Sequence, residues 1–240
     1  MSTFNFLDKN QKHFAVLIDP DKPAVNPLSD FLKTAENAGA ACILIGGSLL
    51  STFSFETLVK EVKRNTSLPV LLFPGNNMQI SSEADGILFL SLLSGRNPEY
   101  LIGQHIHAAP ILKNTGLEII PTAYLLIESG KTTTAAYISN TTPIPSDKPE
   151  IAAATALAGQ YLGMKAIYLD AGSGAINRVN TDIINRVAKE TNLPLVVGGG
   201  IRSSGDLLEA FSAGANLVVI GNHLESNPEL LSEISAVKRI

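Results

Sequence analysis

The hydrophobic residues of this chain gather in short continuous runs, and the segments between the runs carry apolar residues at every third or fourth position. The runs occupy residues 14–19, 41–45, 69–73, 86–90, 118–122, 166–169, 194–197 and 216–220. Continuous apolar runs of this length, rather than alternating ones, are typical of strands that are buried on both faces of a parallel sheet. The pattern therefore predicts eight parallel strands.

Most of the intervening segments have the periodicity of an amphipathic helix. In the segment 55–64, the apolar residues Phe55, Leu58 and Val62 fall on one helical face. Similar patterns predict helices at residues 28–38, 149–162, 181–190 and 203–213. A glycine follows directly where three of these helices are expected to end, at Gly39, Gly163 and Gly214.

Eight strands with helical connections in 240 residues predict a (β/α)8 barrel, or TIM barrel, in preference to an open sheet. The third connection, residues 74–85, is short and carries Gly75-Asn76-Asn77, so its helix is expected to be reduced or missing. No low-complexity linker or shift in composition divides residues 1–240, which we therefore assign to one domain.

Composition and charge narrow the classes of function. The chain is 45% hydrophobic, which allows a large buried core, and its formal net charge of −4 argues against a nucleic-acid partner. The single cysteine, Cys42, excludes an internal disulfide framework and a cysteine-based zinc site. Because residues 1–11 do not resemble a signal peptide and no apolar run approaches the ~20 residues of a membrane span, we expect a soluble, cytoplasmic protein.

The active sites of such barrels lie at the carboxyl ends of the strands, where this chain carries polar residues and glycines. The first run leads into Asp19-Pro20-Asp21, and two carboxylates beside a proline suit Mg²⁺. An Asx turn explains the same residues equally well. The second run ends in Gly46-Gly47-Ser48, where Ser48 is expected either to cap the next segment or to contact the metal.

The ends of the last three runs predict a binding site for a small phosphorylated molecule. After the sixth run, Tyr168 and Asp170 share one face of the strand, and the glycines that follow supply a loop that can wrap a polyol. The seventh run ends in Gly198-Gly199-Gly200 and the eighth in Gly221-Asn222. Loops at these two positions often bind phosphate through backbone N–H groups, and this reading is favoured over simple tight turns.

Taken in chain order, these motifs resemble the geranylgeranylglyceryl/heptaprenylglyceryl phosphate synthase family. The matching segments are Leu17–Lys22, Ile45–Ser48, Tyr168–Gly174, Gly198–Arg202 and Gly221-Asn222, and they extend over nearly the whole chain. The sequence Ala171-Gly172-Ser173-Gly174 resembles that of the family branch that contains archaeal enzymes and some bacterial ones.

The resemblance implies a Mg²⁺-dependent prenyltransferase of ether lipid synthesis, which joins geranylgeranyl diphosphate to the 3-hydroxyl of sn-glycerol 1-phosphate. It also implies membrane contact only through the lipid product, and we expect a homo-oligomer. By this resemblance Asp19 and Ser48 coordinate the metal, and Tyr168 and Asp170 are catalytic. The glycerol is held by Tyr168, Leu169, Asp170, Ala171, Gly172, Ser173 and Gly174, and its phosphate by Gly199, Gly200, Gly221 and Asn222.

Two further expectations concern the reaction. The family usually has glutamate where this chain has Asp170, so the carboxylate that accepts a hydrogen bond from the acceptor hydroxyl is one methylene shorter. The prenyl tail requires an apolar groove, for which the candidates are Phe73, Pro74, Phe89, Leu92, Tyr124 and Leu125.

Two alternatives remain at this stage. One is another phosphate-binding barrel, an isomerase or lyase, although no lysine stands at a strand end where a Schiff base would form. The other is a barrel without catalytic activity that binds a phosphorylated metabolite. A pure phosphate binder needs only the last two loops, so Asp19, Ser48 and Asp170 favour an enzyme.

Overall fold

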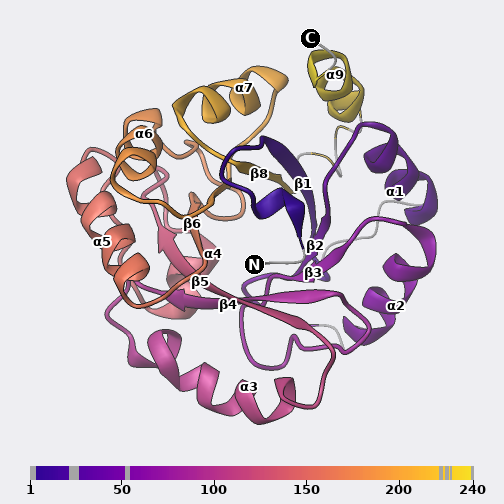
Figure 1. Ribbon diagram of the computed structural model, residues 1–240, viewed down its shortest axis with the longest axis horizontal. Coiled ribbons are helices and arrows are strands. Elements are labelled where there is room, and N and C mark those ends of the chain that lie inside the picture. The colour runs from indigo at the N-terminus through magenta and orange to yellow at the C-terminus, as the bar shows by residue number, and fades with distance from the viewer. Residues whose placement is uncertain are drawn as a thin grey trace.

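A computed structural model of the chain describes residues 4–21, 27–51, 55–221, 224, 227 and 229–238. Its strands form a closed parallel barrel in chain order, with β1 hydrogen-bonded to β8, which confirms the (β/α)8 prediction (Figure 1). The strands are β1 (His13–Ile18), β2 (Ile43–Ile45), β3 (Val70–Leu72), β4 (Gly86–Leu92), β5 (Glu118–Leu126), β6 (Ala166–Asp170), β7 (Leu195–Gly198) and β8 (Leu217–Ile220).

Helices surround the barrel on the outside, except that the short one after β5 lies inside their ring, at the ends of the strands (Figure 1). They are α1 (Leu28–Asn37), α2 (Phe55–Asn65), α3 (Gln104–Leu112), α4 (Thr134–Ser139), α5 (Pro149–Tyr161), α6 (Thr181–Glu190), α7 (Ser204–Ala213) and α9 (Glu229–Lys238). A short π-helical segment, η2 (Glu99–Gly103), leads directly into α3. At the carboxyl end of the chain, α9 packs between α7 and α1 and continues the ring there (Figure 1).

The connection between β3 and β4 contains turns and no helix, as the sequence predicted. The fully buried side chain of Gln79 holds this loop against the end of β2. Its Nε2 donates a hydrogen bond of 2.8 Å to the Gly47 carbonyl, and its Oε1 accepts one of 3.2 Å from the Gly47 N–H. The side-chain amide thus satisfies backbone groups that a strand neighbour would otherwise pair.

The core has two layers because successive strand residues face opposite sides of the sheet. Residues such as Leu44, Leu71 and Tyr168 fill the barrel interior. Their neighbours in sequence, including Ile43 and Leu72, pack between the sheet and the helices. Cys42 is fully buried in the interior layer, and burial raises the pKa of its thiol, so it has no exposed thiolate.

The sequence placed most element ends within two residues, and the exceptions have physical reasons. The glycines predicted to follow helices have positive φ angles of 81° at Gly39, 87° at Gly163 and 120° at Gly214, which confirms that interpretation. Strand β5 was predicted to end at Thr122 and instead continues to Leu126. Thr122 and Tyr124 break the apolar run in the sequence. The strand nevertheless continues, because both side chains point into the barrel interior.

Across the described ranges, no helix is both long enough and apolar enough to span a membrane.

Candidate active site

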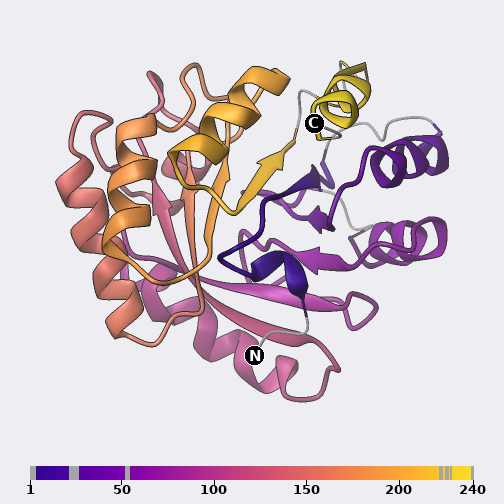
Figure 2. The ribbon, with the colours of Figure 1, turned by 45° about the horizontal axis from the view of Figure 1, so that its top comes forward.

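The carboxyl ends of the strands surround a polar cavity, and the N-terminal segment lies at the opposite end of the barrel. The arrows of β1 and β8 point away from that segment (Figure 2). The cavity is lined by polar groups and glycines from several strand ends, including Asp19, Asp21, Ser48, Asp170, Gly172, Ser173, Gly174, Gly199, Gly200, Arg202 and Gly221. Residues far apart in sequence therefore meet where the sequence predicted a site.

Asp170, the last residue of β6, is a carboxylate that lines this cavity and is only 7% exposed. Both of its oxygens accept hydrogen bonds. The hydroxyl of Tyr124 donates to Oδ2 over 2.6 Å, and the Gly172 N–H donates to Oδ1 over 2.7 Å. Burial raises the pKa of Asp170 above its ordinary value, while these two hydrogen bonds favour the ionised form and offset part of that effect.

Three aromatic rings pack against one another, and one of them, Tyr124, bonds to this carboxylate. Tyr168 stacks on Phe73, with ring centroids 4.9 Å apart, and Tyr124 meets both rings edge-on at 5.6 and 5.8 Å. The interior position of Tyr168 requires glycine on the next strand, because a Cβ at Gly198 would lie 2.4 Å from the Tyr168 hydroxyl oxygen. Burial, together with the charge of Asp170, raises the pKa of both tyrosines, so both keep their protons.

The loop after β7 owes its shape to glycine. Gly199 and Gly200 have φ angles of 81° and 74°, which side chains rarely adopt. A Cβ at Gly199 would lie 2.8 Å from Oδ1 of Asp170, and one at Gly200 would lie 2.9 Å from the Cα of Arg178. The absence of side chains brings backbone directly to the cavity wall, where N–H groups can meet an anion.

Arg202, the residue before the N-cap of α7, adds a positive charge to the same wall of the cavity. Its guanidinium donates a hydrogen bond of 2.6 Å to the carbonyl of Ala175. The start of α7 is closed by a capping box between Ser203 and Asp206. The loop residues, rather than the capped helix end, are therefore the candidates for anion binding.

Asp19 and Ser48 lie in one corner of the cavity, after β1 and β2. A Cβ at Gly47 would lie 2.9 Å from Oδ1 of Asp19, so the glycine lets the carboxylate approach the second loop. The same oxygen accepts a hydrogen bond of 3.1 Å from the N–H of Asp21, which is the Asx turn considered as the alternative. Asp19 therefore forms this turn and also lines the cavity.

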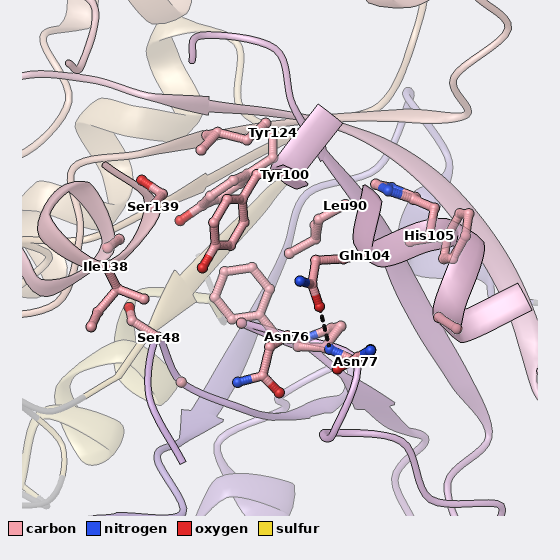
Figure 3. A pocket seen from close by; sticks show the side chains of 18 of the residues that line it. Ser48, Asn76, Asn77, Leu90, Tyr100, Gln104, His105, Tyr124, Ile138 and Ser139 are labelled. Atoms are coloured by element: carbon pink, nitrogen blue, oxygen red, sulfur yellow. Dashed lines mark hydrogen bonds between the residues drawn. The ribbon is translucent and has the colours of Figure 1, made fainter. Parts of the chain in front are cut away.

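A second pocket, lined mostly by apolar side chains, lies beside the first (Figure 3). Five of the six residues expected to form a groove line it, namely Phe73, Pro74, Phe89, Leu92 and Tyr124. The sixth, Leu125, is fully buried among residues of the helix-facing layer, so that expectation was wrong.

Further walls of this pocket come from η2, α3 and α4, which no pattern in the sequence predicted. They include Tyr100, Gln104 and Ile138, and Figure 3 shows these side chains directed toward the pocket from two sides. Gln104 accepts a hydrogen bond of 3.2 Å from the N–H of Asn77, which ties α3 to the β3–β4 loop. The six-residue α4 is too short to give a helical period.

The two cavities share a boundary formed by Gly47, Ser48, Phe73, Tyr124 and Ala135. Tyr124 extends from the apolar pocket to the carboxylate of Asp170. A molecule with a long apolar tail in one pocket and a polar molecule in the other would therefore meet at Tyr124, the partner of Asp170.

The side chains of two predicted site residues do not reach the cavity. Leu169 and Ala171 alternate with Tyr168 and Asp170, and both are buried in the helix-facing layer. Only their backbone can take part in binding, because the strand period that directs Asp170 inward directs its neighbours outward. Asn222 lies outside the described residues.

Comparison with known proteins agrees with this geometry. The PcrB family pattern matches residues 7–239. A geranylgeranylglyceryl phosphate synthase of Spirosoma linguale is 48% identical, with 95% of this chain and 92% of the relative covered. One of Korarchaeum cryptofilum is 42% identical, with 93% and 92% covered.

Among solved structures, the (S)-3-O-geranylgeranylglyceryl phosphate synthase of Thermoplasma acidophilum in complex with sn-glycerol-1-phosphate superposes with a TM-score of 0.91. It is 32% identical and covers 100% of this chain and 98% of its own. A thiamine phosphate pyrophosphorylase of Pyrococcus furiosus, at 13% identity and a TM-score of 0.59, shares the fold alone. The chain thus belongs to the PcrB family.

Proposed function

We propose that this protein is a prenyltransferase that joins geranylgeranyl diphosphate to the 3-hydroxyl of sn-glycerol 1-phosphate and releases diphosphate. The observation that carries the proposal is that two unlike cavities meet at Tyr124, the hydrogen-bond partner of Asp170. An apolar pocket suits the prenyl tail, a glycine-lined polar cavity suits a phosphorylated polyol, and Asp170 lies in the polar cavity, bonded to the tyrosine on the shared boundary. The relatives named geranylgeranylglyceryl phosphate synthase support the same reaction.

The acceptor would bind in the polar cavity through its phosphate. The backbone at Gly199, Gly200 and Gly221 lines this cavity, and Arg202 supplies a cation beside it. We assign Asn222 to the same phosphate site on the family resemblance. This arrangement would leave the far end of the glycerol to reach Tyr168 and Asp170.

Asp170 would accept a hydrogen bond from the acceptor 3-hydroxyl and take up its proton as the new C–O bond forms. The carbon–oxygen bond to the diphosphate breaks at the allylic carbon, and the electron pair leaves with the diphosphate. Asp170 is only 7% exposed, and binding of both substrates would displace water from the cavity around it, so that less water would compete with the glycerol hydroxyl. Binding of both substrates at one boundary supplies the required proximity.

Asp19 and Ser48 form an oxygen donor set that fits Mg²⁺, which binds proteins through one or two carboxylates and completes its shell with water and substrate phosphate. No cluster of three or more His, Cys, Asp or Glu side chains able to hold a metal occurs in the described ranges, so the diphosphate would supply further oxygens. When bound, the ion would neutralise charge on the departing diphosphate.

The cavity favours this reaction over the two alternatives. Among the described residues, no lysine lines the cavity, so nothing there supports a Schiff-base lyase. A barrel that only binds a phosphorylated metabolite would need neither the apolar pocket nor the buried carboxylate of Asp170.

The test is turnover by the purified protein with radiolabelled sn-glycerol 1-phosphate, geranylgeranyl diphosphate and Mg²⁺. We expect a labelled, organic-extractable ether lipid that depends on both substrates and is lost when EDTA is added. The enantiomer, sn-glycerol 3-phosphate, serves as the matched control. Absence of product with this diphosphate and with shorter and longer prenyl diphosphates would refute the proposal.

A further inference from the structure

Tyr124 is the residue that connects the apolar pocket with the carboxylate. Its ring lies on the boundary of both cavities, and its hydroxyl donates to Oδ2 of Asp170 over 2.6 Å. The two residues are 46 positions apart and come together because Tyr124 on β5 pairs with Tyr168 on β6, two residues before Asp170. Side chains two residues apart on a strand share a face.

The hydrogen bonds of Asp170 leave little freedom to its carboxylate. Rotation about the Cβ–Cγ bond of an aspartate is otherwise broad, because this torsion has no sharp staggered minima. Here one oxygen is held by the Gly172 N–H and the other by Tyr124. A single hydrogen bond would leave the group free to rotate about that contact, whereas two on opposite oxygens fix the plane of the carboxylate.

The ring of Tyr124 is itself held in place. It meets the rings of Phe73 and Tyr168 edge-on, at centroid distances of 5.8 and 5.6 Å, and Phe73 stacks on Tyr168. Such edge-to-face contacts favour one ring orientation over others. The hydroxyl is thus presented to Asp170 from a rigid support, and not from a mobile side chain.

We propose that Tyr124 is a positioning residue that orients the Asp170 carboxylate toward the acceptor hydroxyl at the boundary of the two cavities. This role rests on the proposed prenyl transfer. A carboxylate oxygen has two lone pairs, so each oxygen of Asp170 can accept the acceptor hydroxyl in addition to its present partner. Fixing the plane of the carboxylate fixes the direction of those remaining lone pairs. Since Tyr124 also lines the apolar pocket, it sets this direction relative to the prenyl chain.

The role predicts a loss in kcat when the hydroxyl alone is removed. Tyr124→Phe keeps the ring contacts and releases one oxygen of Asp170. We expect kcat to fall by up to about 10²-fold, as misplacement of a reacting group by about 1 Å can cause, with little change in the KM for geranylgeranyl diphosphate. Tyr161→Phe, at a tyrosine of α5 that is 78% exposed, removes a hydroxyl without contact to either cavity and should retain wild-type turnover.

A double-mutant cycle separates positioning from a general structural role. In single-turnover assays, Tyr124→Phe should cost little further rate in an Asp170→Ala background, because no carboxylate remains to be oriented. Equal losses in both backgrounds, a change in KM alone, or wild-type kcat in Tyr124→Phe would each overturn the role.

A crystal structure of Tyr124→Phe tests the role independently of turnover. We expect the Asp170 carboxylate to be rotated, or spread over two orientations, with its Gly172 contact retained or exchanged. An unchanged carboxylate would refute the positioning role even if the wild-type protein proved inactive as a prenyltransferase. An inactive wild type with a rotated carboxylate in the variant would refute the proposed function alone.

Discussion

Replacement of Asp170 by asparagine is the most informative single change, because the structure shows how the amide would be accommodated. Oδ1 faces the Gly172 N–H, which can only donate, so the amide oxygen is expected on that side. The NH2 group would then face Tyr124, whose hydroxyl oxygen can accept. The variant therefore keeps the volume of the side chain and a contact on each side, and it loses the negative charge, while the Tyr124 hydroxyl accepts where it previously donated.

The expected effect on stability has a definite sign. Burial raises the pKa of Asp170, so its ionised form costs free energy in the folded protein above that pKa, and the cost disappears as the pH falls below the unfolded-state pKa. A neutral amide avoids this cost. We therefore expect the melting temperature of Asp170→Asn at neutral pH to be equal to or above that of the wild type. A destabilisation of about 1 kcal/mol would appear as a fall of about 2–4 °C.

The expected effect on catalysis is large. If the carboxylate accepts the proton of the acceptor hydroxyl, kcat should fall by about 10²–10⁴-fold, the range typical of a general base. Steady-state kinetics at saturating geranylgeranyl diphosphate measure this directly. The active form is the carboxylate, so wild-type turnover should decline as the pH falls through the raised pKa of Asp170, while the residual rate of Asp170→Asn should lack that decline. Near-normal turnover in a folded variant would mean that leaving-group ionisation and positioning carry the reaction without this carboxylate.

Three further changes test other parts of the site. Asp170→Glu should retain substantial activity if the loop accommodates one methylene, and complete loss in a folded variant would show that the aspartate geometry is required. Gly200→Val should raise the KM for sn-glycerol 1-phosphate and lower stability by about 1–3 kcal/mol, because φ is 74° and a Cβ would lie 2.9 Å from Arg178; an unchanged KM and melting temperature would contradict both effects. Asp19→Asn should remove most activity without unfolding the barrel, and wild-type rates at limiting Mg²⁺ would exclude Asp19 as a ligand.

The strand ends that carry the chemistry could be predicted because their signals are local. Continuous apolar runs marked the strands, and the strand period placed Tyr168 and Asp170 on one face. The loop after β7 needs glycine because its backbone has positive φ angles. This requirement is local, so it could be inferred from the loop sequence alone.

The remaining parts depend on contacts between distant segments. Tyr124 was expected only as a groove residue, since its hydrogen bond to Asp170 follows from the register of β5 against β6. The wall formed by α3 and α4 gave no periodic signal, because α3 contains Pro110 and buries few of its apolar residues, and α4 has only six residues. The strand period that directs Asp170 into the cavity directs Leu169 away from it. Leu169 was expected to hold the glycerol only because it lies within the matching motif.

A structure of the protein with sn-glycerol 1-phosphate and an unreactive thio analogue of geranylgeranyl diphosphate would show whether the two substrates meet beside Asp170. We expect the acceptor phosphate against the backbone at Gly199 and Gly200, the prenyl chain in the pocket between β4 and α3, and the 3-hydroxyl within hydrogen-bond distance of Asp170. A prenyl chain bound outside that pocket, or an acceptor whose hydroxyl lies away from Asp170 at saturating ligand, would contradict it.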